Sequence, residues 1–290
     1  MSSVDWALQA YSSLSELGIR FLKCLERNLS LYEYVPLKVL SKSLNVKLEK
    51  VNKVAESMRK QRLIVFSASP YKGYTLTSAG LDLLAIKMLA ERDIIIRVGG
   101  VIGMGKESDV YLGVTPRGNY VALKFHRLGR TSFRKTRRLR SYGLVSGGWL
   151  KQCISAARRE FKALEMLYGK MNVPQPIDRE YHVMVMSPIS GCMLYRYRGL
   201  LTRRHFEEVV EGMKISFCNG VIHSDLSEYN LIVDDDSHIL FFDFPQWVPP
   251  THPNADLYLK RDVRNMIKFF RERDVSIPSL EDVLKVIRGA

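Results

Sequence analysis

The sequence predicts an α+β fold in which an N-terminal winged helix-turn-helix precedes a larger domain of two lobes. Apolar residues recur at helical spacing up to about residue 92, whereas strand-like runs take over from Ile94 onward. The 290 residues are sufficient for two domains that each bury a core. We therefore place the first domain at 1–92 and the second at 93–290, with lobes at about 93–186 and 190–290.

The first domain shows the order of elements of a winged helix-turn-helix. Short helices are expected at 37–44 and 48–61, because the pattern between them breaks near Asn45. Two strand-like runs follow at 63–66 and 74–77, joined by a turn that contains proline and glycine, and a capped helix then runs to about Ala90. This hairpin is the expected wing.

The charge of the chain favours a polyanionic partner. Lysine and arginine number 44 against 30 acidic residues, which gives a formal net charge of +14. The second helix of the winged helix-turn-helix is basic, with six basic and two acidic residues between 47 and 62. We expect this helix to contact nucleic acid, with a solvated amphipathic helix as the alternative.

No stretch of the sequence has the roughly 20 apolar residues of a membrane helix, and the first ten residues lack the pattern of a secretory signal. The expectation is therefore a cytoplasmic protein with no membrane partner.

A glycine-rich segment at the start of the second domain predicts a phosphate-binding turn. The run Gly103-Met-Gly-Lys-Glu-Ser-Asp-Val110 nearly fits the glycine loop of kinases, with serine in place of the third glycine. Glycine lets backbone N–H groups approach phosphates closely because it has no side chain. The residues of this run that we expect to contact nucleotide are Gly103, Gly105, Lys106 and Ser108.

A lysine-bearing strand follows the glycine-rich segment at the spacing found in kinases. The run Val121-Ala-Leu-Lys124 matches the strand whose lysine contacts the α- and β-phosphates of ATP. Such a lysine requires an acid on a facing helix, and Glu160 is our choice, with Glu165 as the alternative. Backbone groups of Met186 and Ile189, where an apolar strand ends, are the expected adenine contacts.

The most specific motif is His223-Ser-Asp-Leu-Ser-Glu-Tyr-Asn230. Asp225 is the expected catalytic base, and Asn230, five residues later, is an expected metal ligand, as in the catalytic loop of kinases. Asp243-Phe-Pro follows an expected strand at 239–242, which makes Asp243 the second metal ligand. The expected ion is Mg²⁺, or Mn²⁺ in its place, bridging the phosphates of ATP.

Other features depart from conventional protein kinases. Only 47 residues follow Asp243, too few for an activation loop and a peptide-binding subdomain, so the second domain is predicted to be a truncated protein-kinase-like domain. Pro245 replaces the glycine of the D-F-G motif, which makes Asp243 less free to move. The segment from Arg127 to Lys151 has eight basic and no acidic residues. We expect it to contact RNA and to be phosphorylated in cis at Thr131 or Ser132, with a solvated loop as the alternative.

Taken together, the glycine-rich segment, the basic insertion, the His223–Asn230 motif and Asp243-Phe-Pro-Gln resemble the RIO family of atypical kinases, and the winged helix is similar to its second subfamily. The resemblance implies a serine/threonine protein kinase and ATPase of archaeal type in late maturation of the small ribosomal subunit. It implies the precursor small subunit and its rRNA as partners, and a transient phosphate on Asp243.

Two other functions remain open at this point. A small-molecule kinase of the aminoglycoside-phosphotransferase type shares the H-x-D-x-x-x-x-N motif and a late aspartate. A DNA-binding regulator that only senses nucleotide would explain the winged helix. The basic insertion speaks against the first alternative, and the full set of lysine, acids and asparagine speaks against the second.

Overall fold

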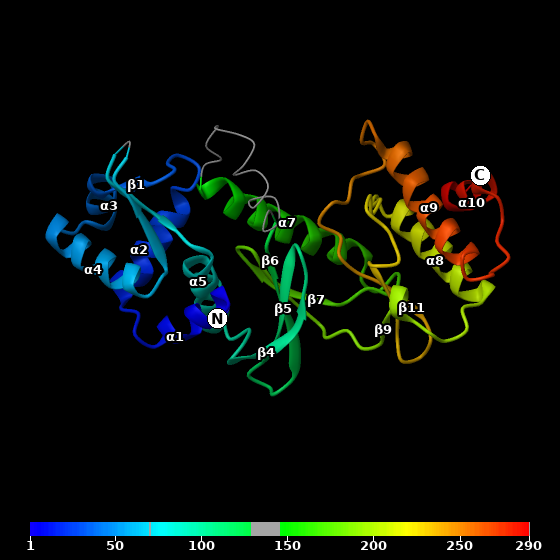
Figure 1. Cartoon of the computed structure of the whole chain (residues 1–290), viewed down its shortest axis with the longest axis horizontal. Coiled ribbons are helices and arrows are strands. Elements are labelled where there is room, and N and C mark those ends of the chain that lie inside the picture. The colour runs from blue at the N-terminus through cyan, green and yellow to red at the C-terminus, as the bar shows by residue number, and fades with distance from the viewer. Residues whose placement is uncertain (70, 129–145, 290) are drawn as a thin grey trace. The chain divides into compact units, whose positions relative to one another are not determined.

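The computed structural model describes all residues except 70, 129–145 and 290 (Figure 1). The chain forms two compact units, Met1–Ala157 with Asp178–Met184 and Arg158–Ile177 with Val185–Ala290. The predicted domain boundary at residue 92 lies inside the first unit and stays a prediction. Of the described helices, none is both long and apolar enough to cross a membrane.

The winged helix-turn-helix is confirmed element by element. Its helices are α1 (Ser3–Tyr11), α2 (Glu16–Arg27), α3 (Leu37–Leu44), α4 (Leu48–Lys60) and α5 (Ser78–Glu91). Its strands β1 (Val35–Pro36), β2 (Ile64–Ser67) and β3 (Gly73–Leu76) form an antiparallel sheet in the order β1-β3-β2. Asn45 ends α3 with φ of 53°, a left-handed conformation that asparagine tolerates, and this turns the chain into α4. Gly80 brings α5 against Leu63, since a Cβ at Gly80 would lie 2.1 Å from the Leu63 carbonyl oxygen.

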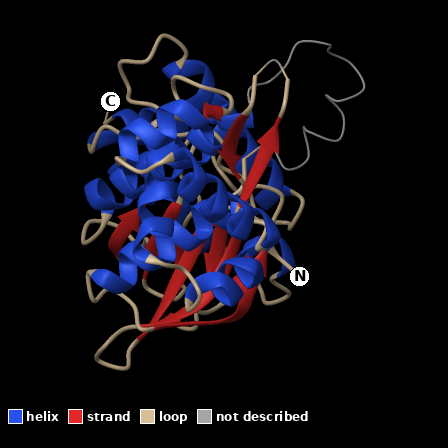
Figure 2. Ribbon diagram, turned by 90° about the vertical axis from the view of Figure 1, so that its left-hand side faces the viewer, coloured by secondary structure: helices blue, strands red, loops and turns tan. Residues whose placement is uncertain are grey.

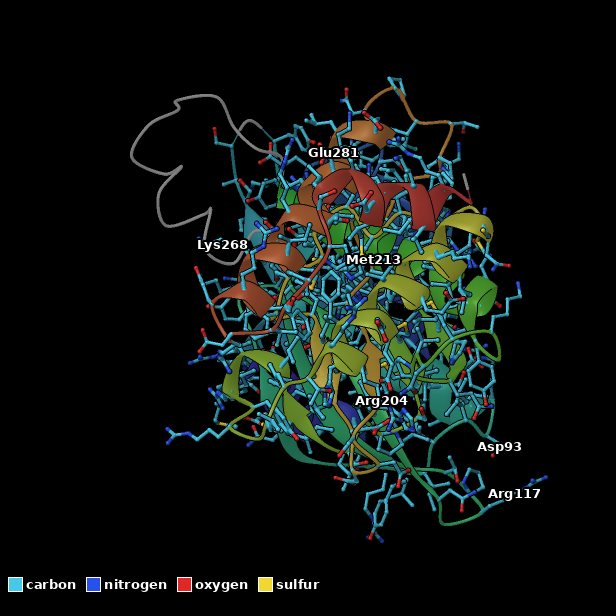
Figure 3. The ribbon with its side chains drawn as sticks, turned by 90° about the vertical axis from the view of Figure 1, so that its right-hand side faces the viewer. Asp93, Arg117, Arg204, Met213, Lys268 and Glu281 are labelled. Atoms are coloured by element: carbon cyan, nitrogen blue, oxygen red, sulfur yellow. The ribbon has the colours of Figure 1, made fainter. Side chains whose placement is uncertain are left out.

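A five-stranded sheet follows, in the order β4-β5-β6-β8-β7 (red strands in Figure 2). Its strands are β4 (Arg97–Met104), β5 (Ser108–Val114), β6 (Tyr120–His126), β7 (Pro176–Glu180) and β8 (Val183–Met186). The turn from β5 to β6 has Arg117 at its exposed end (Figure 3). The strand-like run that begins at Ile94 enters the sheet only at Arg97, because the N–H of Ile94 donates to the carbonyl of Leu89 and closes α5 instead. Ile95 is buried there without joining the sheet.

The remaining elements lie mostly in the second unit. They are α7 (Ser146–Leu167), β9 (Cys192–Met193), the 3-10 helix η1 (Leu194–Arg196), α8 (Arg203–Cys218), β10 (Leu231–Val233), β11 (Ile239–Phe241), α9 (Ala255–Arg271) and α10 (Leu280–Arg288). Figure 3 labels Met213 on α8, Lys268 on α9 and Glu281 on α10. Phe206 of α8 and Phe270 of α9 pack edge to face with ring centroids 5.4 Å apart, and both are buried. This helical core supports the small sheet β11-β10-β9.

Candidate active site

The glycine-rich segment forms the tight turn between β4 and β5. The N–H of Gly105 donates to the carbonyl of Ser108 at 2.8 Å, and Gly103 pairs with Val110 across the two strands. Packing does not require glycine here, since the nearest atom to a Cβ placed on Gly103 is 3.8 Å away, and neither glycine has positive φ. The missing side chains leave exposed backbone that a ligand can approach closely.

Lys124 is aligned with this turn across the sheet. Residue Val110 of β5 pairs with Gly103 of β4 on one side and with Lys124 of β6 on the other. Neighbouring strands are about 5 Å apart, so Gly103 and Lys124 are separated by roughly 10 Å across the sheet. Lys124 is only 3% exposed, which is unusual for a lysine and typical of one with a dedicated role.

A β-hairpin brings the other predicted catalytic residues together in the second unit. Strand β10 begins directly after Asn230, and β11 ends just before Phe242 and Asp243. Because the strands pair antiparallel, the N–H of Phe242 donates to the carbonyl of Asn230 at 3.2 Å. The Asn230 side-chain amide donates to the backbone carbonyl of Asp225 at 2.7 Å. Asp225 itself is exposed, as a base that must meet a substrate requires.

Asp243 has φ of 67°, in the left-handed region that costs a non-glycine residue about 1–3 kcal/mol. Such strain is concentrated at functional sites. The carboxylate of Asp243 and the amide oxygen of Asn230 are oxygen donors of the kind that Mg²⁺ prefers, and they would hold such an ion together with phosphates and water. Among the described residues no group of three or more His, Cys, Asp or Glu side chains is arranged to hold a metal. One carboxylate and one amide oxygen fit an ion that substrate phosphates would also hold.

His223 is the buried histidine that begins the catalytic motif. Its ring is buried, contacts the ring of Phe244 at a tilt of 43° with centroids 4.5 Å apart, and has Nε2 3.2 Å from the carbonyl of Phe242. Burial lowers the pKa of His223, although its hydrogen bond to Phe242 and the charges of Asp243, Asp225 and Glu160 oppose the shift. Burial thus favours the neutral imidazole, whereas the three carboxylates favour its charged form.

The other predicted residues are placed as follows. Glu160 lies on α7 and is 1% exposed, whereas Glu165 is exposed. The partnership of Glu160 with Lys124 stays a prediction. Met186 ends β8 and is buried, and Ile189 is half-buried in the segment that follows. Thr131 and Ser132, the predicted phosphorylation sites, lie outside the described residues.

Asp262 of α9 is a functional residue that the sequence reasoning missed. Its carboxylate accepts hydrogen bonds from the N–H groups of Ser224 at 2.7 Å and Leu226 at 3.2 Å, on both sides of Asp225. It also holds Ser224 in a left-handed conformation with φ of 59°. A signal was available, since Asp262 shares a helix face with the apolar residues Leu259, Val263 and Met266. An acid on a buried helix face requires partners.

Asp262 predicts a pH dependence of stability. Burial raises its pKa to about 7, although its bonds to Ser224 and Leu226 lower it. Because the folded pKa exceeds the unfolded one, the stabilisation from this group is present below about pH 4 and is lost as pH rises through about 7. Asp262→Asn should flatten this slope, which is at most about 1.4 kcal/mol per pH unit. Urea unfolding of wild type and variant from pH 4 to pH 8 measures how the free energy of unfolding changes with pH. The same pH dependence in both proteins would contradict the raised pKa of Asp262.

Two family models and a set of related kinases match this chain. The family model of the RIO domain matches residues 109–283, and the model described as "Rio2, N-terminal" matches residues 11–92. The serine/threonine-protein kinase RIO2 of Caenorhabditis elegans is 38% identical over 263 residues, covering 88% of this chain and 49% of that protein. The chain thus spans about half the length of that relative.

Shorter relatives are matched over most of their length. The kinase rio2 of Schizosaccharomyces pombe is 32% identical over 98% of this chain and 85% of its own. The RIO-type kinase Rio2 of Methanocaldococcus jannaschii is 33% identical over 83% of this chain and 91% of its own. Among solved structures, the ADP/Mg²⁺-phosphoaspartate complex of the Rio2 kinase from Chaetomium thermophilum superposes with a TM-score of 0.83, at 31% identity, covering 96% of this chain and 88% of its own.

Proposed function

Because this chain belongs to the RIO kinase family and has the N-terminal domain of its Rio2 members, we propose that it is an ATP-dependent serine/threonine phosphotransferase with ATPase activity. The observation that carries the proposal is the hairpin that joins Asn230 and Asp243 to the loop of Asp225. A base and two metal ligands at one end of a small sheet are the parts that phosphoryl transfer needs.

The proposed nucleotide contacts follow from the roles that the kinase motifs assign to these residues. The turn from Gly103 to Ser108 would cover the phosphates with its backbone N–H groups, and Lys124, oriented by Glu160, would contact the α- and β-phosphates. Backbone groups of Met186 and Ile189 would receive the adenine. Catalysis by this set is mostly positioning and charge neutralisation.

The chemistry centres on Asp225 and Asp243. Bound Mg²⁺ would neutralise charge on the phosphates, held by Asn230 and Asp243. Asp225 would orient an acceptor hydroxyl and take its proton. The phosphoaspartate of the Chaetomium complex supports a second route for this chain: a carboxylate oxygen of Asp243 bonds to the γ-phosphorus, the bond to the β-phosphate oxygen breaks and ADP leaves. Water, whose proton Asp225 would take, then attacks the phosphorus of the acyl phosphate; phosphate leaves and the carboxylate of Asp243 is restored, so that ATPase turnover results.

The proposed partner is the precursor small ribosomal subunit and its rRNA, in the cytoplasm. Support comes from the charge of +14 and from the surface of α4, whose lysines at 50, 53 and 60 are exposed while its apolar side faces the core. Exposed lysines on such a helix bind phosphate backbones through counterion release. The basic insertion, with Thr131 and Ser132, is the second proposed contact.

ATP turnover with and without purified precursor small subunits tests the function. We expect turnover without subunits and stimulation by them. The double variant Lys50→Glu/Lys53→Glu should need about tenfold more subunits for half-maximal stimulation, because it removes and reverses two phosphate contacts. The charge-matched control is Lys268→Glu/Lys285→Glu on exposed positions of α9 and α10, which should behave as wild type. Absence of MgATP turnover in every condition would overturn the proposal.

A further inference from the structure

A buried cluster of four charged or ionisable side chains lies in the first unit, next to the glycine-rich turn, and the mechanism gives none of the four a role. It consists of Asp82, Asp109, Arg127 and His182, and we call it the Arg127 cluster. Each of the four is at most 3% exposed. Burial of this kind is costly unless every charge is paired and hydrogen-bonded.

All three side-chain nitrogens of Arg127 donate hydrogen bonds within the cluster. Its Nη1 and Nη2 donate to the two carboxylate oxygens of Asp82 at 2.7 and 2.8 Å, and its Nε donates to Asp109 at 3.1 Å. His182 adds Nε2 at 2.7 Å from Asp82. This fork, the pair of parallel hydrogen bonds from Nη1 and Nη2 to Asp82, fixes both the position and the angle of the guanidinium. The single ammonium group of a lysine cannot reproduce it.

The charges of the cluster are maintained at neutral pH. Burial opposes ionisation of Asp82, but Arg127 and the hydrogen bond to His182 outweigh it and lower the pKa of Asp82 to about 2. Burial lowers the pKa of His182, so that its imidazole is neutral despite Asp82. The cluster is therefore a guanidinium between two carboxylates, with a neutral imidazole as a further hydrogen-bond partner.

The cluster joins segments that are far apart in the sequence. Asp82 belongs to α5, the last helix of the winged helix-turn-helix, which lies in the same unit as β5 and β6. Asp109 directly follows Ser108 of the glycine-rich turn, and the backbone N–H of Arg127 donates to the carbonyl of Glu107 in that turn at 2.6 Å. Arg127 thus contacts the turn through its backbone N–H and the adjacent Asp109 through Nε. Its Nη1 and Nη2 bind Asp82 of α5.

We propose that Arg127 is a positioning residue that sets the glycine-rich turn for nucleotide and couples its position to helix α5 of the winged helix-turn-helix. The inference rests on the proposed function in one respect, that the turn binds the phosphates of ATP. By linkage, whatever displaces α5 changes nucleotide affinity, and nucleotide binding changes α5 to the same extent.

Variants in the full chain separate this role from ordinary stabilisation. Asp82→Asn leaves every residue of the turn in place, yet it should raise the KM for ATP about tenfold while kcat stays within about twofold. Arg127→Lys keeps the charge but loses the fork, and it should shift KM in the same direction.

The matched control is Arg92→Gln, which breaks the bridges of Arg92 to Asp178 and Glu180 at 3.0 Å. Arg92 ends α5 without touching the turn, so KM should not change. Equal KM values for Asp82→Asn and Arg92→Gln would overturn the coupling.

Hydrogen–deuterium exchange on the wild-type chain tests the coupling without any substitution. Saturating MgADP should slow amide exchange at 103–110 and also at 78–91, whereas α3 at 37–44, which contributes nothing to the cluster, should be unchanged. Protection of 103–110 with unaltered exchange at 78–91 would overturn the coupling alone. Unaltered exchange at 103–110 would overturn nucleotide binding by the turn, and the coupling with it.

Discussion

Asp225→Asn is expected to lower ATP turnover by about 10²- to 10⁴-fold while the affinity for MgADP stays within about twofold. Asparagine has nearly the shape of aspartate but cannot accept a proton. The loop itself should survive, because Asn230 donates to the backbone carbonyl of residue 225 and Asp262 holds the N–H groups of its neighbours. Steady-state turnover and calorimetric titration with MgADP measure the two quantities.

The control for this variant is Asp235→Asn, an exposed aspartate in the turn between β10 and β11. It removes the same charge from the same unit without touching the catalytic loop, and both turnover and affinity should equal those of wild type. Turnover of Asp225→Asn within a factor of three of wild type would remove Asp225 from the mechanism. A parallel loss of MgADP affinity would instead assign Asp225 to nucleotide binding.

Arg127→Met is expected to lower the free energy of unfolding of the first unit by about 3–5 kcal/mol. The variant leaves Asp82 and Asp109 buried without the guanidinium that lies 2.7 and 3.1 Å from them. Methionine fills much of the volume, so the loss reports the uncompensated charges rather than a cavity. Urea unfolding followed by circular dichroism measures it.

A matched substitution separates burial from charge. Arg92→Met also removes an arginine that bridges two carboxylates at 3.0 Å, but its side chain is 44% exposed. Solvent screens these exposed ion pairs, so the free energy of unfolding should fall by less than about 1 kcal/mol. Similar losses for the two variants would contradict the view that the Arg127 cluster depends on its burial.

Local pattern explains most of what the sequence could predict. The helices at 37–44 and 48–60, the wing and the strand before Asp243 each follow from apolar periodicity and turn residues within a few positions. The catalytic motifs were recognisable because phosphoryl transfer fixes their spacing along a loop or strand. The register of β10 and β11 then explains why Asn230 and Asp243, thirteen residues apart, lie at the same end of a hairpin.

What the sequence could not predict depends on packing between distant segments. Asp82 and Arg127 are 45 positions apart, and no local pattern pairs an acid on a helix with an arginine after a strand. The run Ile94-Ile-Ile has strand propensity, yet the closing turn of α5 and burial of Ile95 keep it out of the sheet. The helix face of Asp262 marks it in the sequence as a buried acid that needs partners, but its bonds to the neighbours of Asp225 depend on the packing of α9 against the catalytic loop.

The hairpin of β10 and β11 also restricts which changes in chain length are tolerable near the site. Side chains alternate between the two faces of a strand, so loss of one residue from β11 would shift the pairing and rotate Asp243 to the opposite face. Extra residues in the exposed bend at 235–237 leave the pairing of Leu231 with Phe241 intact. Natural or engineered insertions, including a fluorescent reporter, should therefore be accommodated at that bend and nowhere else along the two strands.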